Sequence, residues 1–309
     1  GARTDPAMGA GKIGPEFTFG IYMQEALQQP ILIIKTAWGG KSLHTDFRSP
    51  SAGVYELNDS QVVSMEKRGL DLKEERAKLK LSSGVYYRLM IEHVKHVLAD
   101  IERVYPGYDE KQGFELAGFV WFQGWNDLVT REVYPNRDRK GGYDKYSEWM
   151  AMFIRDVRKD LKAPELPFVI GVMGVNGPLE SVEKRYRGVH GNFRDAMAAP
   201  ASLREFRGNV LAVQTAPSWD MPLDRVQKQR EGLNGRKRTL QKKVTAGELT
   251  EKETSKELAE IETKLSSPEL GEFWNRGASN AAYHYYGCAK TMALIGKAFA
   301  EATLELQED

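Results

Sequence analysis

Apolar positions along the chain fall into two kinds of pattern. Four short runs rich in Val, Ile or Phe are typical of buried parallel strands: Ile31–Ala37, Leu116–Gln123, Phe168–Met173 and Val210–Thr215. Between them, apolar residues recur at helical spacing over 94–101 and 146–157, and the stretch from Cys288 to about Leu306 does the same. Strands alternating with helices predict βαβ units and a parallel sheet covered on both faces.

The segment from Asp224 to Leu270 departs from this pattern. Its first half is basic ("QKQREGLNGRKRTLQKK") and its second half is acidic ("GELTEKETSKELAEIE"). Thr250 and Glu253 have the spacing of a capping box, and apolar residues recur every seven positions before it. We expect a helical hairpin, 224–270, inserted into a single domain of 1–309. The commoner role of such a hairpin is a solvated structural arm, and the sharper alternatives are an oligomerisation contact or a lid.

Charge and composition exclude several classes of protein. Lys and Arg number 44 against 43 Asp and Glu, so there is no basic field to collect nucleic acid or an anionic membrane surface. No stretch approaches the roughly 20 apolar residues of a membrane span. Cys288 is the only cysteine, so an internal disulfide or a multi-cysteine metal site is not expected. The 41% hydrophobic content suffices for a globular core.

Polar residues gather where two of the predicted strands end. The stretch "GFVWFQGWND" (118–127) follows one apolar run with Gln123, and "TAWGGKSL" (36–43) follows another with Gly39 and Gly40. Ligands of parallel α/β sheets bind beyond the carboxyl ends of the strands. A backbone N–H from Gly39 or Gly40, together with the Gln123 amide, has the donors that a developing oxyanion requires. The pairing favours acyl transfer.

Acyl transfer without a metal needs a general base, and the chain has five histidines. His93 and His96 fall within a helical pattern and are most simply surface or core-edge residues. His44 follows the glycine turn, where it could contact substrate, but a histidine in such a loop is more often only solvated. His190 is expected in a glycine-rich loop before a helix, lining a pocket. His284 is expected on a loop just before the last helix and is the preferred base.

Other reaction classes lack their signatures. The sequence has no HxH or HExxH spacing, so neither a metal site nor a cofactor is expected. It also has neither GxxxxGK[ST] nor GxSxG, which disfavours P-loop NTPases and ordinary α/β-hydrolases.

Several blocks in fixed order resemble a known family: "IGPEFTFG" (13–20), "ILIIKTAWGGKSL" (31–43), "GFVWFQGWND" (118–127), "FRDAM…GNVLAVQTAPSWD" (193–220) and "HYYGCAKTMALIGKAFA" (284–300). Together they resemble the sialate O-acetylesterase-like branch of the SGNH hydrolases, akin to carbohydrate acetylesterases of family six. The resemblance implies a three-layer α/β/α fold with a central parallel sheet, flavodoxin-like in architecture. It implies removal of acetyl groups from sugars, and it favours a secreted or periplasmic location.

The resemblance also implies roles for individual residues. It matches Gly39 or Gly40 to the second-block oxyanion glycine, Gln123 to the third-block oxyanion residue, and His284 to the catalytic base. Around the same strand ends, we expect four residues to contact an acetylated carbohydrate: Lys41, Trp125, Asn126 and His190.

The chain also departs from the family. No "GQSN"-like turn with a nucleophilic serine occurs in it, and Ser42 and Ser218 do not lie in such a turn. We therefore expect an upstream segment, carrying a first strand and the serine, docked beside Ile31–Ala37 as an N-terminal fragment of the same protein. The carboxylate three residues before the histidine is replaced by Ala281, which leaves Asp220, a backbone carbonyl or a catalytic dyad open. Trp125 stands where many relatives have Glu.

The sequence thus predicts a carbohydrate O-acetylesterase that works by a Ser-His mechanism with a Gly/Gln oxyanion hole. The alternative is a non-catalytic carbohydrate-binding or scaffold protein of the same fold that lacks the nucleophile.

Overall fold

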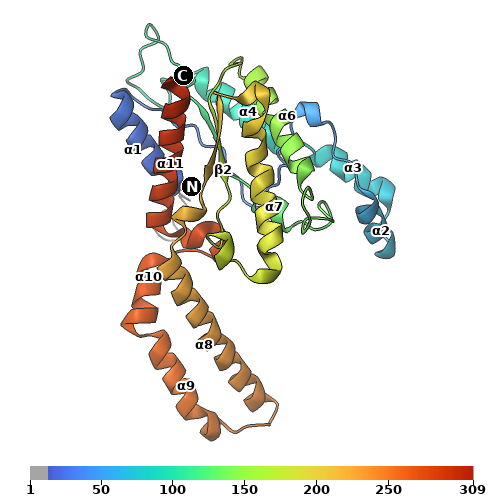
Figure 1. The fold of residues 1–309 in the computed structure, drawn as a ribbon, viewed down its shortest axis with the longest axis vertical. Helices are drawn as coiled ribbons and strands as arrows, with labels where there is room; N and C mark the ends of the chain where they lie inside the picture. The colour runs from blue at the N-terminus through green and yellow to red at the C-terminus, as the bar shows by residue number, and fades with distance from the viewer. Residues whose placement is uncertain (1–12, 309) are drawn as a thin grey trace.

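The structure is a computed structural model that describes residues 13–308, drawn as a ribbon in Figure 1. Three strands and a larger number of helices alternate along the first part of the chain, and helices alone follow. In chain order the elements are α1 (Pro15–Leu27), α2 (Asp59–Lys67), α3 (Leu72–Ser82), α4 (Val85–Leu98), β1 (Phe119–Trp121), α5 (Trp125–Val129), α6 (Asp144–Asp160), β2 (Phe168–Val172), α7 (Arg187–Ala198), β3 (Val210–Gln214), α8 (Met221–Thr245), α9 (Glu251–Leu265), α10 (Phe273–Gly277) and α11 (Ala289–Glu308).

The sheet is parallel, with the strands in the order β1-β2-β3. Phe119 pairs with Phe168 at one end of β1, and Phe168 pairs in turn with Val210 on β3. All residues of β2 are buried, as expected for the central strand of a sheet with both faces covered. Three of the four predicted strands are therefore confirmed, with shorter bounds than the apolar runs.

Helices cover both faces of the sheet. Figure 1 shows α1 and α11 on one side of β2, and α4, α6 and α7 on the other. Successive side chains of a strand point to opposite faces, so neighbouring residues at the end of β1 contact different helix layers. The Trp121 ring lies 4.5 Å from the Phe153 ring of α6, and the Phe122 ring lies 5.2 Å from the Phe299 ring of α11. The helices expected over 94–101, 146–157 and after Cys288 correspond to the end of α4, to α6 and to α11. The predicted α/β fold class is confirmed at this level.

The predicted strand Ile31–Ala37 is wrong. These residues run without regular secondary structure, and Leu32 and Ile33 are 45% and 38% exposed. Ile33 lies against Gly20 of α1, and Lys35 pairs with Glu16 on the same helix. An apolar, β-branched run has the composition of a strand, but a strand also needs a neighbour for its backbone hydrogen bonds. Within residues 13–308, no strand pairs with 31–37.

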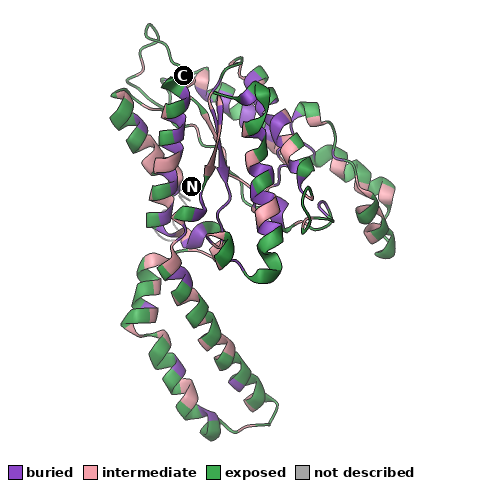
Figure 2. Ribbon diagram, in the orientation of Figure 1, coloured by how far each residue is buried: buried purple, intermediate pink, exposed green. Residues whose placement is uncertain are grey.

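The charged segment contains two long helices, α8 and α9, which lie side by side and project from the sheet in Figure 1. We call residues 221–265 the two-helix arm. Leu240 and Ile261 are buried between its helices, and Arg236 pairs with Glu257 across them. Most of its remaining surface is exposed (Figure 2).

Of two local sequence features in the arm, the structure keeps the capping box and does not form a turn at Asn234 and Gly235. The capping box is confirmed: the Thr250 hydroxyl accepts from the Glu253 N–H, and the Glu253 carboxylate accepts from the Thr250 N–H. Asn234 and Gly235 favour a turn by sequence, yet α8 runs through both without a break, because packing against α9 outweighs that local preference. Of the helices in the described part of the chain, none is long and apolar enough to cross a membrane.

Candidate active site

The glycine turn lies directly beside the end of β1. Gly40 has φ +73°, in the left-handed region that favours glycine, whereas Gly39 has none of this constraint. A Cβ added to Gly39 would meet nothing within 4 Å, and one added to Gly40 would lie 4.0 Å from the Asn126 amide nitrogen. The structure therefore brings together the glycines and the polar residues of "GFVWFQGWND" as predicted, although the run before the glycines is not a strand.

A single buried carboxylate holds the two stretches together. Asp127, which is fully buried, accepts hydrogen bonds from the backbone N–H of Leu43 at 2.8 Å and of His44 at 3.2 Å. It also accepts from the Tyr134 hydroxyl at 2.9 Å and from the Gln123 amide at 2.8 Å. Asp127 thus caps the chain after the glycine turn and joins it to Gln123 at the end of β1, while Tyr134 supplies a fourth hydrogen bond to the same carboxylate.

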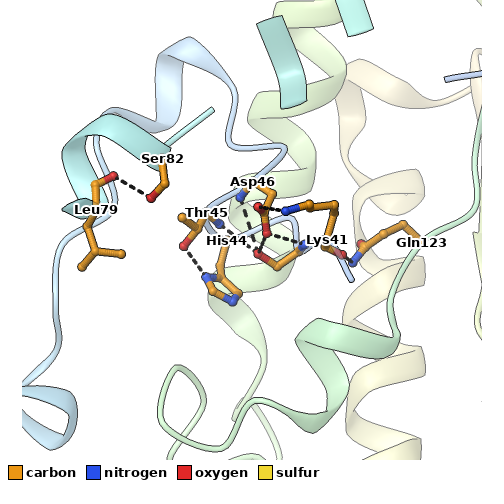
Figure 3. Close-up of polar contacts among 8 residues, drawn as sticks. Lys41, His44, Thr45, Asp46, Leu79, Ser82 and Gln123 are labelled. Atoms are coloured by element: carbon orange, nitrogen blue, oxygen red, sulfur yellow. Dashed lines mark hydrogen bonds and ion pairs between the residues drawn. The ribbon is translucent and has the colours of Figure 1, made fainter. Parts of the chain in front are cut away.

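Gln123 is used within this network. Its amide nitrogen donates to the Lys41 carbonyl at 2.9 Å (Figure 3), in addition to Asp127. Both amide hydrogens are therefore directed at protein acceptors. The Gln123 carbonyl oxygen is buried and has no hydrogen-bond partner among residues 13–308. In this arrangement Gln123 ties the glycine turn to the strand end.

Asn126 and Trp125 follow at the start of α5. Both side chains are half-buried, and the Asn126 amide makes no hydrogen bond to another residue of the described chain. The Trp125 ring stacks on Tyr283, with centroids 5.5 Å apart and planes 27° apart. Because Tyr283 precedes His284 directly, this stack joins the strand-end residues to the segment that carries the expected base.

Lys41 is turned toward α4 and its own loop. Its ammonium lies 4.1 Å from the centre of the Tyr86 ring and 3.3 Å from the Asp46 carboxylate. Tyr86 and then Asp46 raise the pKa of Lys41 above its ordinary value, so the group is a stable cation. Figure 3 shows the pair of Lys41 and Asp46 beside the Gln123 contact.

His284 lies on the surface, in the 3-10 segment Ala282–Gly287 just before α11. Its Nδ1 is 3.1 Å from the Asn280 amide nitrogen, and its ring meets Tyr283 edge-on at 4.6 Å. The predicted position before the last helix is therefore confirmed. Asp220, a candidate to orient the imidazole, instead caps α8 through the Leu223 N–H at 2.9 Å and faces Lys290 at 3.3 Å.

His190 is not in a loop, and that prediction is wrong. It lies within α7, where Val189 and Phe193 give the helix its buried face, and its side chain is only 6% exposed. Burial and the nearby Arg194 lower the pKa of His190 to about 4, so it is neutral at neutral pH. Its Nδ1 is buried without a hydrogen-bond partner among the described residues. The glycines that suggested a loop are accommodated in the helix by its packing on the sheet.

The two serines considered as nucleophiles, Ser42 and Ser218, have different surroundings. Ser42 is 4% exposed; its hydroxyl donates to Asp46 at 2.9 Å and accepts from the Thr45 N–H at 3.3 Å. These bonds close a local turn and occupy the hydroxyl. Ser218 is half-buried in a short 3-10 turn after β3. Neither environment resembles an exposed nucleophile held against an imidazole.

Sequence reasoning missed the residues that shape the histidine loop. Asn280 and Asp224 are hydrogen-bonded to Tyr286, although Asp224 lies 62 residues away, and the Tyr285 hydroxyl binds Gly174 and Thr215. The only signal in the sequence is the aromatic cluster "YHYY". Among residues 13–308, no group of three or more His, Cys, Asp or Glu is placed to hold a metal ion.

Comparison with known proteins gives one family. The family model described as "Carbohydrate esterase, sialic acid-specific acetylesterase" matches residues 3–196, more than half of the chain. The matched part contains the glycine turn and the end of β1, and it stops before the two-helix arm and His284. Searches of curated proteins and of solved structures gave no match.

Proposed function

Since this chain belongs to the carbohydrate esterase family of sialic acid-specific acetylesterases, we propose that it hydrolyses acetyl esters on sugars or polysaccharides with His284 as general base. One observation carries the assignment of residues: the Trp125–Tyr283 stack brings the histidine loop to the strand end where Gly40 and Asn126 lie. In this proposal, His284 is the base, the N–H groups near Gly40 and Asn126 are the donors, and Trp125 offers an aromatic surface to the sugar ring, all at the end of β1.

In the proposed reaction, a serine attacks the acetyl carbonyl and passes its proton to His284. The carbonyl oxygen gains negative charge and is stabilised by N–H donors. The backbone N–H of Gly39 or Gly40 supplies one donor. For the second donor, two side-chain amides compete: Gln123, which already donates to Lys41 and Asp127, and Asn126, whose amide faces Gly40. The geometry favours Asn126 as the donor and Gln123 as the residue that fixes the turn.

The serine is proposed to reach the site on an additional strand. The free edge of β1 and the extended, apolar run 31–37 both leave backbone groups without a strand partner among the described residues. A parallel strand beside β1 would satisfy these groups and cover Leu32 and Ile33. We place the nucleophile at the carboxyl end of that strand, next to Gly40. In the same scheme the chain is a single domain, and residues 224–270 are an insertion into it.

The experiment is acetate release from acetylated sialic acid and acetylated xylan by the protein as its full gene encodes it. His284→Ala should lower kcat by at least about 100-fold, because general-base catalysis contributes about 10²–10⁴-fold. The matched control is His96→Ala, which removes an exposed histidine from α4 and should leave kcat unchanged. Wild-type turnover in His284→Ala would remove this residue from the mechanism.

A second outcome separates the rival function. The non-catalytic alternative predicts no acetate release above background from any acetylated carbohydrate, together with measurable binding of the same compounds. Calorimetric titration with the acetylated sugars would then show binding that Trp125→Ala weakens, since aromatic faces supply much of the contact area in such sites.

A further inference from the structure

The backbone that carries His284 is held in an uncommon conformation. Tyr285 and Tyr286, the two residues after it, both adopt left-handed angles, with φ of 53° and 57°. Bulky side chains rarely adopt this region, because it is sterically strained for residues with a Cβ. Two consecutive residues in this conformation persist only where surrounding contacts impose it, and both tyrosines make such contacts.

Tyr285 is anchored to the carboxyl ends of two strands. Its buried hydroxyl accepts from the Gly174 N–H at 2.8 Å, just after β2. The same hydroxyl lies 2.9 Å from the Thr215 hydroxyl, just after β3. These bonds fix the start of the tyrosine pair to the sheet.

Tyr286 is anchored to the root of the two-helix arm. Its side chain is 3% exposed, and its hydroxyl donates to the Asp224 carboxylate at 2.7 Å. Asp224 lies in the first turn of α8, is itself 3% exposed, and pairs through its other oxygen with Lys228 at 2.7 Å. A charged acceptor inside the protein makes this a strong hydrogen bond.

The backbone of Tyr286 continues the connection to His284. The Tyr286 carbonyl accepts from the N–H of Ser279 at 2.7 Å and from the N–H of Asn280 at 2.8 Å. The Asn280 side chain is the group that lies 3.1 Å from His284 Nδ1. His284 lies between Asn280 and Tyr286 in the chain, and the backbones of these two residues are hydrogen-bonded to each other. A displacement of Tyr286 would therefore move the backbone on both sides of the imidazole.

We infer that the Tyr286–Asp224 hydrogen bond positions His284 for its proposed role as base, so that the root of the two-helix arm is part of the support of the active site. This inference rests on the proposed function. Asp224 and Tyr286 are positioning residues, since neither touches the reacting atoms. Misplacing a catalytic group by about 1 Å can cost about 100-fold in rate, which is the scale on which the contact should act.

The first test compares two matched tyrosines. Tyr286→Phe removes the hydroxyl that binds Asp224, and Tyr87→Phe removes a hydroxyl that binds Asp160 at 2.8 Å and has no part in the histidine loop. Both variants should lose comparable stability. Only Tyr286→Phe should lower kcat, by roughly tenfold or more and with KM within about twofold, because orientation in the transition state is what is lost.

The second test asks for rescue at the partner. Asp224→Asn keeps an oxygen that accepts from Tyr286, whereas Asp224→Ala removes it. Asp224→Asn should retain kcat within about threefold, and Asp224→Ala should resemble Tyr286→Phe, if acceptance of this bond is what matters. Equal losses in both Asp224 variants, or none in either, would overturn the inference.

A spectroscopic measurement keeps the inference testable without turnover. With five histidines in the chain, the imidazole C–H signals of isotope-labelled protein are few, and His284→Gln identifies one of them. That signal and its titration midpoint should change in Tyr286→Phe and remain as in wild type in Tyr87→Phe. An unchanged signal in Tyr286→Phe would refute positioning by this bond. If His284→Ala instead retains full activity, the proposed function fails, whatever the signal shows.

Discussion

The glycine-turn side and the histidine side of the site are held in different ways. On the first, one buried carboxylate, Asp127, receives four hydrogen bonds from residues that all lie within the part matched by the family. On the second, His284 is exposed and lies beyond the matched part, and its position depends on Tyr286 and Asp224. The glycine-turn side is therefore built into the core, whereas the histidine side lies on a loop anchored by residues distant in the sequence.

The largest expected effect comes from removing the central carboxylate. Asp127→Ala leaves the Leu43 and His44 N–H groups and the Tyr134 hydroxyl without their acceptor. Each unsatisfied buried donor costs about 1–3 kcal/mol, so the free energy of unfolding should fall by at least about 3 kcal/mol. Urea unfolding measures this loss. Asp109→Ala, which removes an exposed carboxylate that accepts from Lys111 N–H, should change it by no more than about 0.5 kcal/mol.

If Asp127→Ala unfolded at the same urea concentration as Asp109→Ala, the glycine-turn side would not depend on Asp127, and the contrast between the two sides would be wrong. It would be sharpened if Tyr286→Phe lost protection from hydrogen exchange only around 279–288, while Asp127→Ala lost it across the sheet.

The second effect separates the two amides on the glycine-turn side. Asn126→Ala should lower kcat by roughly 100-fold with little change in KM and in stability, since an oxyanion donor acts in the transition state. Gln123→Ala should instead lower stability, because it removes the donor to Lys41 and to Asp127. Steady-state kinetics and urea unfolding of both variants give the answer. The reverse result would return Gln123 to the donor role that the sequence suggests.

The smallest effect distinguishes the two glycines. Gly40→Ala forces a Cβ into the left-handed region and should cost about 1 kcal/mol of stability, whereas Gly39→Ala has open space and no such strain. A drop in kcat in Gly40→Ala beyond that in Gly39→Ala would show that the Gly40 conformation sets the direction of an N–H donor. Equal behaviour of the two variants would make the turn a connection only.

Much of the sheet is predictable from the sequence, because its strands are apolar runs with helical periodicities between them. The meeting of Gly40, Gln123 and Asn126 is predicted from the rule that strand ends converge at one edge of a parallel sheet, but only Gln123 and Asn126 follow a strand. The glycine turn is instead held there by the hydrogen bonds of the next residues to Asp127 and Gln123. Residues 31–37 show the limit. Their composition is that of a strand, but pairing is decided by which segment lies beside them, and apolarity alone carries no information on that.

The histidine side shows a second limit. Its place before the last helix is visible in the sequence, but the conformation of its loop is not. Tyrosine ordinarily favours extended backbone, so nothing local predicts a left-handed pair at Tyr285 and Tyr286. The pair is imposed by partners at Gly174, Thr215 and Asp224, all distant in the chain. His190 fails for the converse reason: glycines near it suggest a loop, and packing on the sheet keeps the segment helical.

The open run at 31–37 also bears on how the protein behaves at high concentration. Four consecutive aliphatic residues, Ile31 to Ile34, precede Lys35, the one charge in the run, and β1 is an edge strand of the sheet in the described chain. Such segments are templates for edge-to-edge association between molecules. A second charge in the run, for example Leu32→Lys, should reduce association between molecules and raise solubility if the run is exposed. Unchanged solubility would indicate that the run is covered in the functional protein.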